Sequence, residues 1–144
     1  MECSIKWVDG VQFVAETGSG HAIVIDGAPE VGGRNTGARP METVLAGTGA
    51  CTASDVVVIL KRSGQDVTHC EIRLTAERAP TDPKVFTTIH MHFVVRGRNL
   101  KRSIVENAIK LSHTKYCSAS AMLGKTAAIT HDLELVDEGA PAAA

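Results

Sequence analysis

The sequence predicts a single α+β domain: three strands, one long helix, two more strands, two helices and a last strand. Three observations support this prediction. Asp9-Gly10 and Asp26-Gly27 separate short, partly alternating apolar segments, a run of small and apolar residues fills 40–62, and alternation returns after it. With 144 residues, the chain can bury a core without disulfides. We expect residues 1–136 to form the domain and residues 137–144 to be a disordered tail.

The first three strands follow from turn signals. Segments 4–8 and 11–14 lie on either side of Asp9-Gly10, a dipeptide typical of a tight β-hairpin turn. A third strand over 21–25 ends at Asp26-Gly27, which is another turn signal. We therefore expect three antiparallel strands.

A long helix is predicted from residue 40 to residue 62. Residues 28–38 contain glycine and proline without periodicity, which predicts a loop that leads to the helix. Pro40 suits the first turn of a helix, and Gly64 can adopt the left-handed conformation that ends one. Because the helix is small or apolar around most of its circumference, one subunit of this size buries it poorly. This pattern predicts an intimate homodimer.

The second half of the chain repeats strand and helix patterns. Residues 67–77 and 85–95 alternate well enough to form a second hairpin, with a turn that contains Pro80 and Pro83. Asn99 is expected to cap a helix through about His113. A short helix over 117–125 and a last strand over 127–136 complete the prediction.

Composition excludes several classes of function. Fifteen basic residues balance sixteen acidic ones, for a formal net charge of −1, so we expect no nucleic-acid partner. We see no basic amino-terminal region followed by an apolar segment, and no apolar run of spanning length, which predicts a cytoplasmic chain without a membrane partner. In that reducing compartment the four cysteines are expected to be thiols.

The four cysteines differ in their sequence surroundings. Cys3 and Cys70 lie in strand-like segments and are interpreted as small buried apolar residues. Cys51 lies mid-helix among glycine, alanine and threonine, where small neighbours leave room for a small molecule to approach the sulfur. Cys117 begins a helix after Lys115, so unpaired amide groups and positive charge should stabilise its thiolate and leave it accessible.

Cys51 has no such help from its position within a helix. A reactive Cys51 would need a cationic side chain from elsewhere, and Arg34 and Arg39 in the preceding loop are the candidates in the sequence. Cys51 and Cys117 also lack the close spacing of a Cys-x-x-Cys redox motif. Spacing alone therefore leaves open whether these two cysteines act together.

Two motifs carry a resemblance to a known family. Residues 40–51, Pro-Met-Glu-Thr-Val-Leu-Ala-Gly-Thr-Gly-Ala-Cys, followed by Ser-Asp-Val-Val at 54–57, resemble the first cysteine helix of the osmotically inducible protein C and organic hydroperoxide resistance (OsmC/Ohr) family. Lys-Tyr-Cys-Ser at 115–118 resembles its second cysteine motif. The resemblance is to an OsmC-like subgroup, and it implies antiparallel sheets wrapped around long central helices in an intertwined homodimer.

The resemblance implies a thiol-dependent peroxidase that reduces organic hydroperoxides in an antioxidant, oxidative-stress role. Cys51 would attack the hydroperoxide and become a sulfenic acid, which Cys117 would resolve as a disulfide. A dithiol, such as a protein-bound dihydrolipoyl group, would reduce that disulfide. This thiolate chemistry requires no flavin, and we expect no bound cofactor or metal.

One departure from the family pattern concerns the activation of Cys51. Family members have a glutamate directly after the helix-initiating proline, and an arginine from the preceding loop meets it beside the first cysteine. Here Met41 takes that place, and Glu42 lies about 180° around the helix from Cys51. The candidate catalytic set is therefore Cys51 and Cys117, with Glu42, Arg39 and Arg34 as candidate activating residues, and weak or redirected activity stays open.

Three further features leave alternatives. Asp55 shares the helix face of Cys51, and as a nearby carboxylate it should raise the pKa of the Cys51 thiol. The alternative is that Asp55 is a surface or dimer-contact carboxylate. His90 and His92 share one strand face, where a solvated surface is favoured over metal ligation. The alternative function is a non-catalytic dimeric module that keeps the fold and binds a hydrophobic small molecule, because Met41 replaces the activating glutamate.

Overall fold

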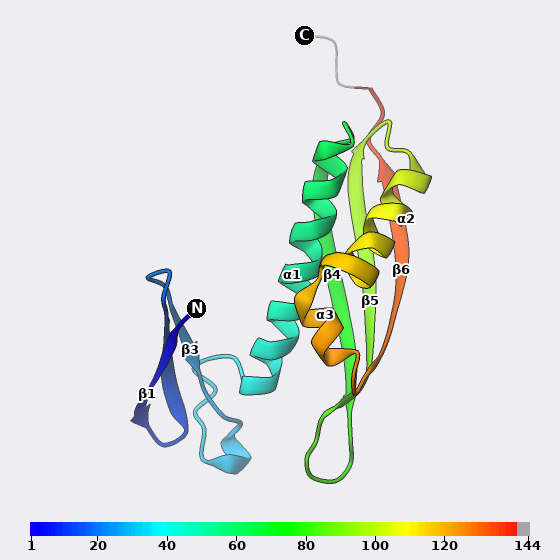
Figure 1. The fold of residues 1–144 in the computed structure, drawn as a ribbon. Coiled ribbons are helices and arrows are strands. Elements are labelled where there is room, and N and C mark those ends of the chain that lie inside the picture. Colours follow the sequence, from blue (N-terminus) through cyan, green and yellow to red (C-terminus); the bar gives the residue numbers. More distant parts are fainter. Residues whose placement is uncertain (141–144) are drawn as a thin grey trace. The chain divides into compact units, whose positions relative to one another are not determined.

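A computed structural model describes residues 1–140 (Figure 1). It has the mixed α and β content that the sequence predicts. The elements in chain order are β1 (Cys3–Asp9), β2 (Gln12–Thr17), β3 (Ala22–Ile25), the 3₁₀ turn η1 (Pro29–Val31), α1 (Pro40–Arg62), β4 (Asp66–Arg78), β5 (Phe86–Arg98), α2 (Arg102–Leu111), the π-helical turn η2 (Ser112–Tyr116), α3 (Ser118–Leu123) and β6 (Ala128–Asp137).

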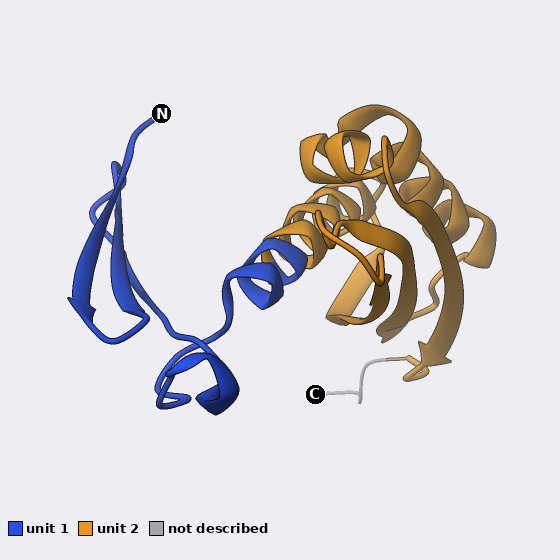
Figure 2. Ribbon diagram, turned by 90° about the horizontal axis from the view of Figure 1, so that it is seen from below, with its two compact units in different colours: residues 1–46 blue, residues 47–144 orange. Residues whose placement is uncertain are grey.

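The chain forms two compact units (Figure 2): a smaller unit of residues 1–46 and a larger unit of residues 47–144. The boundary falls inside α1, between Ala46 and Gly47. The predicted single domain over 1–136 stays a prediction. Of the predicted tail, Asp137 is the last residue of β6, and residues 141–144 lie outside the described residues.

The smaller unit contains the antiparallel sheet β1-β2-β3, as the turn signals predict. Gly10 has a φ of +53° in the first turn, a conformation that glycine adopts easily. The loop after β3 is organised by the buried carboxylate of Asp26. It accepts hydrogen bonds from the hydroxyl and amide of Thr36 and from the amides of Gly27 and Arg34. The Thr36 hydroxyl contributes most to lowering the pKa of Asp26, which falls to about 2.

The larger unit contains the sheet β4-β5-β6, with helices over one face (Figure 1). Along β5, Ile89, Met91, Phe93 and Val95 are buried, in the alternation expected for a strand that packs one face on a core. The prediction of purely antiparallel sheets is wrong for the last pair, since β5 and β6 run parallel. The segment α2-η2-α3 connects them, and parallel neighbours require such a long crossover.

Helix α1 begins and ends where the sequence predicts, and Gly64 after it has a φ of +70°. Its buried stripe includes Thr48, Thr52, Val56 and Leu60, which recur every four residues and therefore share one side of the helix. By length and composition alone, α1 is apolar enough to span a bilayer, contrary to our expectation from the sequence. This is weak evidence for a membrane span, because core helices of soluble proteins pass the same test.

The start of α2 differs from the prediction. Asn99 is not its N-cap: it has a φ of +51°, and its amide donates to Asp137, while Lys101 occupies the N-cap position. The helix also ends at Leu111, before the predicted end at His113, because the chain continues into the π-helical turn η2. The short helix α3 then follows Cys117, as expected.

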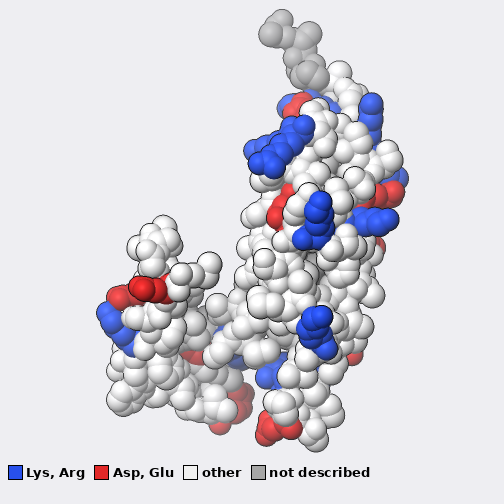
Figure 3. Space-filling view, viewed as in Figure 1, with Lys and Arg blue, Asp and Glu red and all other residues white. Residues whose placement is uncertain are grey.

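Charged side chains are scattered over the face shown in Figure 3, where lysine and arginine do not gather into one basic patch. Several large apolar side chains of the smaller unit are exposed, and Trp7 has a relative exposure of 68%. The others in this unit include Ile5, Val8, Ile23, Val24 and Val31. These side chains form an exposed apolar surface of the kind that marks an interaction site.

Candidate functional site

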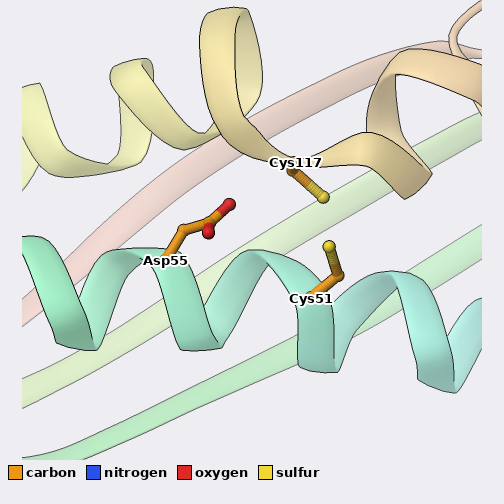
Figure 4. Close-up of side chains that lie close together, drawn as sticks. All are labelled: Cys51, Asp55 and Cys117. Atoms are coloured by element: carbon orange, nitrogen blue, oxygen red, sulfur yellow. The ribbon is translucent and has the colours of Figure 1, made fainter.

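The larger unit brings Cys51 and Cys117 together, although they are far apart in the sequence. Cys51 lies on α1, and Cys117 lies in the connection between η2 and α3. The two Sγ atoms and a carboxylate oxygen of Asp55 all lie within 4.8 Å of one another. Figure 4 shows the two sulfurs pointing toward each other, with Asp55 one turn further along α1. We call Cys51, Cys117 and Asp55 the thiol cluster.

Cys117 is held by hydrogen bonds at the N-cap of α3. Its Sγ accepts a hydrogen bond from the amide of Ser120 at 3.4 Å and lies 3.2 Å from the hydroxyl of Thr52. Burial raises the pKa of Cys117, but the hydroxyls of Ser120 and Thr52, the Ser120 amide and the neighbouring Cys51 lower it below its ordinary value. The predicted lowering is therefore present, with hydrogen bonds among its causes.

The structure corrects the predicted accessibility of Cys117. The residue is 2% exposed, so its expected accessibility is wrong. Lys115, the expected source of positive charge, extends over its neighbour, with Nζ 5.3 Å from the ring centre of Tyr116. Cys117 is therefore a buried thiol stabilised mainly by local polar groups.

Cys51 is half-buried and has the opposite pKa shift. The backbone amide of Ala119 lowers its pKa, but burial, Cys117 and Asp55 together raise it above the ordinary value. The upward contribution of Asp55 is the effect that its spacing from Cys51 predicts. Of the two sulfurs, the more exposed one is therefore the weaker acid.

Asp55 is anchored within the thiol cluster. It is half-buried, and its Oδ2 accepts a hydrogen bond of 2.9 Å from the hydroxyl of Ser112. Ser112 is fully buried at the start of η2, and its backbone carbonyl accepts the amide of Cys117 at 2.8 Å. The same residue thus orients Asp55 and fixes the backbone of Cys117. The sequence offered no signal for Ser112, because a π-helical turn has no clear composition signature.

The predicted activating residues have partners within the smaller unit. Arg34 pairs with Asp9. The amide of Arg39 donates to Glu42 at 2.9 Å, and the guanidinium lies 3.8 Å from the same carboxylate. Glu42, in the third position of α1, thus caps the helix by accepting the amide of Arg39, which is one half of a capping box. The activating roles of Glu42, Arg39 and Arg34 stay predictions.

The other two cysteines lie outside the thiol cluster. Cys70 is half-buried in β4, and burial raises its pKa. Cys3 is exposed in β1, so its predicted burial is wrong. Both residues can serve as controls for chemistry at the thiol cluster.

A depression of about 300 Å³ lies beside the thiol cluster on the Asp55 side. Apolar side chains form much of its lining, and Arg62 contributes a charge. The lining residues are Asp55, Val58, Ile59, Arg62, Ser63, Leu111 and Tyr116. The depression could accommodate the organic part of a small molecule next to Asp55.

A second polar cluster lies on β5 and β6. His90 and His92 both contact the Asp132 carboxylate, at 2.9 and 3.0 Å. His90 also lies 2.8 Å from the Thr130 hydroxyl, and His92 lies 3.5 Å from Glu134. These side chains are partly exposed, with Asp132 at 55%. We call His90, His92 and Asp132 the histidine cluster.

Comparison with known proteins gives a consistent picture. A family model described as OsmC-like protein matches residues 33–132. Protein YhfA of Escherichia coli K12 is 46% identical over 139 residues, which cover 94% of this chain and 98% of that protein. The crystal structure of a hypothetical protein from Aquifex aeolicus is 28% identical with a TM-score of 0.78, and covers 94% of this chain and 97% of its own.

The structure of an organic hydroperoxide resistance protein shares the fold. The organic hydroperoxide resistance protein OhrB of Bacillus subtilis is 18% identical with a TM-score of 0.62, and the match covers 93% of this chain and 98% of that one. At this identity the likeness concerns the fold alone. These comparisons confirm the resemblance that the two cysteine motifs indicated, together with the α+β fold. The implied intertwined homodimer stays a prediction.

Proposed function

Because the chain belongs to the OsmC-like protein family, we propose that it is a thiol-dependent peroxidase for organic hydroperoxides. The observation that carries this proposal is the thiol cluster, in which Sγ of Cys51 and Sγ of Cys117 lie within 4.8 Å. Two thiols at that separation can form a disulfide after a modest movement. Such a pair suits a two-cysteine reductase in a stress response.

In the proposed reaction, Cys51 acts first because it is the more exposed sulfur. Its thiolate attacks the terminal oxygen of the hydroperoxide, the O–O bond breaks, and the alkoxide takes up a proton to leave as an alcohol. Cys51 is then a sulfenic acid. The thiolate of Cys117 attacks that sulfur, the S–O bond breaks, hydroxide leaves and takes up a proton, and a disulfide forms.

Polar neighbours prepare both steps. The proton of Cys51 can pass to the adjacent sulfur of Cys117, which accepts the Ser120 amide as a hydrogen-bond donor. The amide of Ala119 interacts with the sulfur of Cys51 and favours its thiolate. A dithiol, such as a lipoylated protein, would then attack the disulfide and return both cysteines to thiols. None of these proposed reaction steps uses a bound cofactor.

We also propose that the protein acts as a cytoplasmic homodimer. The smaller unit exposes large apolar side chains, including Trp7 at 68%, Ile5 at 58% and Val8 at 52%. Helix α1 is long and apolar, and Val44 and Val58 on it are 43% and 44% exposed. A second copy of the chain would cover such surfaces, since extensive exposed apolar area marks interaction sites. Sedimentation velocity of the reduced protein tests the dimer.

The activity is tested with the reduced wild-type protein, cumene hydroperoxide and a dithiol. We expect Cys51→Ser to consume no more hydroperoxide than buffer does. In a single turnover without the dithiol, Cys117→Ser should consume about one equivalent per chain and retain a sulfenic acid on Cys51, because the resolving thiol is missing, whereas wild type should form the disulfide. Cys70→Ser is the matched control and should retain wild-type turnover. Turnover that persists in folded Cys51→Ser would refute the assignment.

The alternative is a non-catalytic module that binds a hydrophobic small molecule. Two observations favour it: the depression of about 300 Å³ with apolar lining, and the raised pKa of Cys51, to which burial and Asp55 contribute. Native mass spectrometry of freshly purified protein tests this function. A retained small molecule, displaced when Val58→Asp fills the depression with a charge, would support the module. Rapid hydroperoxide turnover by ligand-free protein would contradict it.

A further inference from the structure

We infer that Cys51, Cys117 and Asp55 form a binding site for a thiophilic divalent cation, and that Zn²⁺ fits their chemistry best. The inference concerns metal binding and does not depend on the proposed peroxidase function. It also departs from our expectation from the sequence, which included no metal. That expectation followed from the thiolate chemistry that the family resemblance implies, whereas the ligands come from two distant segments that only the fold brings together.

The three ligand atoms already have the separation that a metal site requires. Both sulfurs and one carboxylate oxygen lie within 4.8 Å of one another. In a tetrahedral Zn²⁺ site with Zn–S distances of about 2.3 Å, two sulfur ligands lie about 3.8 Å apart. Separations of no more than 4.8 Å leave this distance within the reach of side-chain rotation. Three protein ligands would leave a fourth position for water.

The ligand types favour zinc over other common cations. Calcium and magnesium bind to oxygen ligands, whereas thiolates select softer ions. Two thiolates and one carboxylate form a mixed set of the kind that Zn²⁺ accepts. A tetrahedral arrangement with one open position is also typical of zinc sites that are not purely structural.

Each proposed ligand has its own hydrogen-bond donor behind it. The amide of Ala119 interacts with Sγ of Cys51, and the amide of Ser120 donates to Sγ of Cys117. The hydroxyl of Ser112 donates to Asp55 at 2.9 Å. Metal ligands in proteins usually carry such supporting donors, which orient the ligand and stabilise its charge. The peroxidase reaction gives no role to the bond between Ser112 and Asp55, whereas a metal site does.

A bound Zn²⁺ would also reduce the net negative charge of the site. Two thiolates, one carboxylate and Zn²⁺ sum to −1, compared with −3 for the same three anions without the cation. Formation of the site from two thiols releases two protons to the solvent, with no change in oxidation state. The cation thereby relieves the repulsion among three anions in a half-buried gap.

The histidine cluster is a poorer site by comparison. Its two imidazoles share the carboxylate of Asp132, and the side chains of His90 and Asp132 are 44% and 55% exposed. Among residues 1–140, the thiol cluster is the group of three or more potential ligands whose atoms lie close enough to hold one ion. The inference is therefore confined to Cys51, Cys117 and Asp55.

Metal binding and disulfide formation exclude each other at this site. A cation bound to both sulfurs uses the lone pairs with which Cys51 would attack a hydroperoxide. Oxidation of the pair to a disulfide removes both thiolates and would release the cation. If the proposed peroxidase function is correct, Zn²⁺ is therefore expected to inhibit it reversibly.

The test is a titration of the fully reduced, metal-free protein with Co²⁺ and then Zn²⁺. We expect one Co²⁺ per chain, with the thiolate charge-transfer and tetrahedral absorption bands, and displacement of Co²⁺ by Zn²⁺. Binding should weaken at least about a hundredfold in Cys51→Ser and Cys117→Ser, and about tenfold in Asp55→Asn and in Ser112→Ala. Controls Cys3→Ser, Cys70→Ser and the exposed carboxylate variant Asp66→Asn should bind as wild type does.

A second measurement uses only the wild-type chain, in case a cysteine variant fails to fold. One equivalent of Zn²⁺ should protect Cys51 from iodoacetamide at least about tenfold, measured on its peptide by mass spectrometry, while Cys3 stays reactive. Absence of Co²⁺ binding, binding retained in a folded cysteine variant, unchanged binding in Asp55→Asn, or no protection of Cys51 would each overturn the inference. None of these outcomes depends on hydroperoxide turnover.

Discussion

The thiol cluster and the histidine cluster lie on opposite sides of the sheet β4-β5-β6. The first lies among the helices that cover one face, where Cys117 is 2% exposed and Ser112 and Thr52 are buried. The second lies on strand residues that alternate with the buried side chains of β5 and remain partly exposed. Each cluster thus combines two titratable side chains with one aspartate, but in different surroundings. Of the two, the thiol cluster combines limited water access with fixed hydrogen-bond donors.

The largest expected difference between the clusters is in activity. His92→Gln and Asp132→Asn should leave the rate of hydroperoxide consumption within about twofold of wild type, while Cys51→Ser removes it. The reason is that Cys51 supplies the nucleophile in the proposed reaction, whereas His92 and Asp132 bond to each other on the sheet. A timed peroxide assay of the three variants measures this. Comparable losses in all three would show that the clusters are not independent.

The next effect separates the two sulfurs within the thiol cluster. In the native reduced protein, Cys51 should react with iodoacetamide at least about tenfold faster than Cys117, because access outweighs thiolate fraction when a thiol is buried. The lower pKa of Cys117 opposes this order, so the ratio should narrow as pH falls. Peptide mass spectrometry after short exposures gives both rates. Faster labelling of Cys117 would contradict the burial that we describe.

A stability measurement compares the two faces of β5 directly. Ile89→Ala should lower the free energy of unfolding by about 2–5 kcal/mol, because Ile89 is fully buried and leaves a cavity. His90→Ala, the matched control on the other face, should cost less than about 1 kcal/mol. Urea denaturation followed by circular dichroism gives both values. Equal losses would mean that the histidine face is also covered in solution.

The smallest expected effect is a pH dependence from the histidine cluster. The hydrogen bond to Asp132 raises the pKa of His92, with Glu134 adding to it. Stability from this pair is therefore fully present below the unfolded pKa of about 6.5 and lost as pH rises through the higher folded value. The melting temperature of wild type should exceed that of His92→Gln by more at about pH 5.5 than at about pH 8. A constant difference would contradict the interaction.

Asp132 sets the lower pH limit of the range in which the His92–Asp132 pair stabilises the fold. The hydrogen bond to His92 lowers the pKa of Asp132, with His90 contributing as well. Its contribution is thus present above the unfolded pKa of about 3.9 and lost as pH falls through the lower folded value. The advantage of wild type over His92→Gln should therefore shrink again in strong acid.

Sequence predicted the elements better than it predicted their pairing. The bounds of α1 were accurate because Pro40 and Gly64 mark its two ends with strong local preferences. The parallel pairing of β5 and β6 was missed, since it depends on the path of a crossover and not on the strand residues. Asn99 was misplaced because asparagine suits both an N-cap and the left-handed conformation that it adopts here.

In the candidate site, too, some residues could be predicted from the sequence and others could not. Motifs identified Cys51 and Cys117, and helical spacing placed Asp55 on the face of Cys51. The supporting groups were not predictable, because Ser112 and the Ser120 amide reach the site through η2 and the N-cap geometry of α3. Local sequence does not predict which distant side chain such a donor will contact.

The π-helical turn η2 makes the position of one sulfur a matter of residue count. A π turn bonds each amide to the carbonyl five residues earlier, as the amide of Cys117 does with Ser112, so it holds one more residue than an α turn. Deletion of Thr114 from η2 would leave only enough residues for an α turn between Ser112 and Cys117, and would so change the direction in which Cys117 faces Cys51. The number of residues in η2 thus determines the orientation of Cys117. An insertion or deletion there is expected to separate the two sulfurs completely, whereas a point substitution is expected to shift them only slightly.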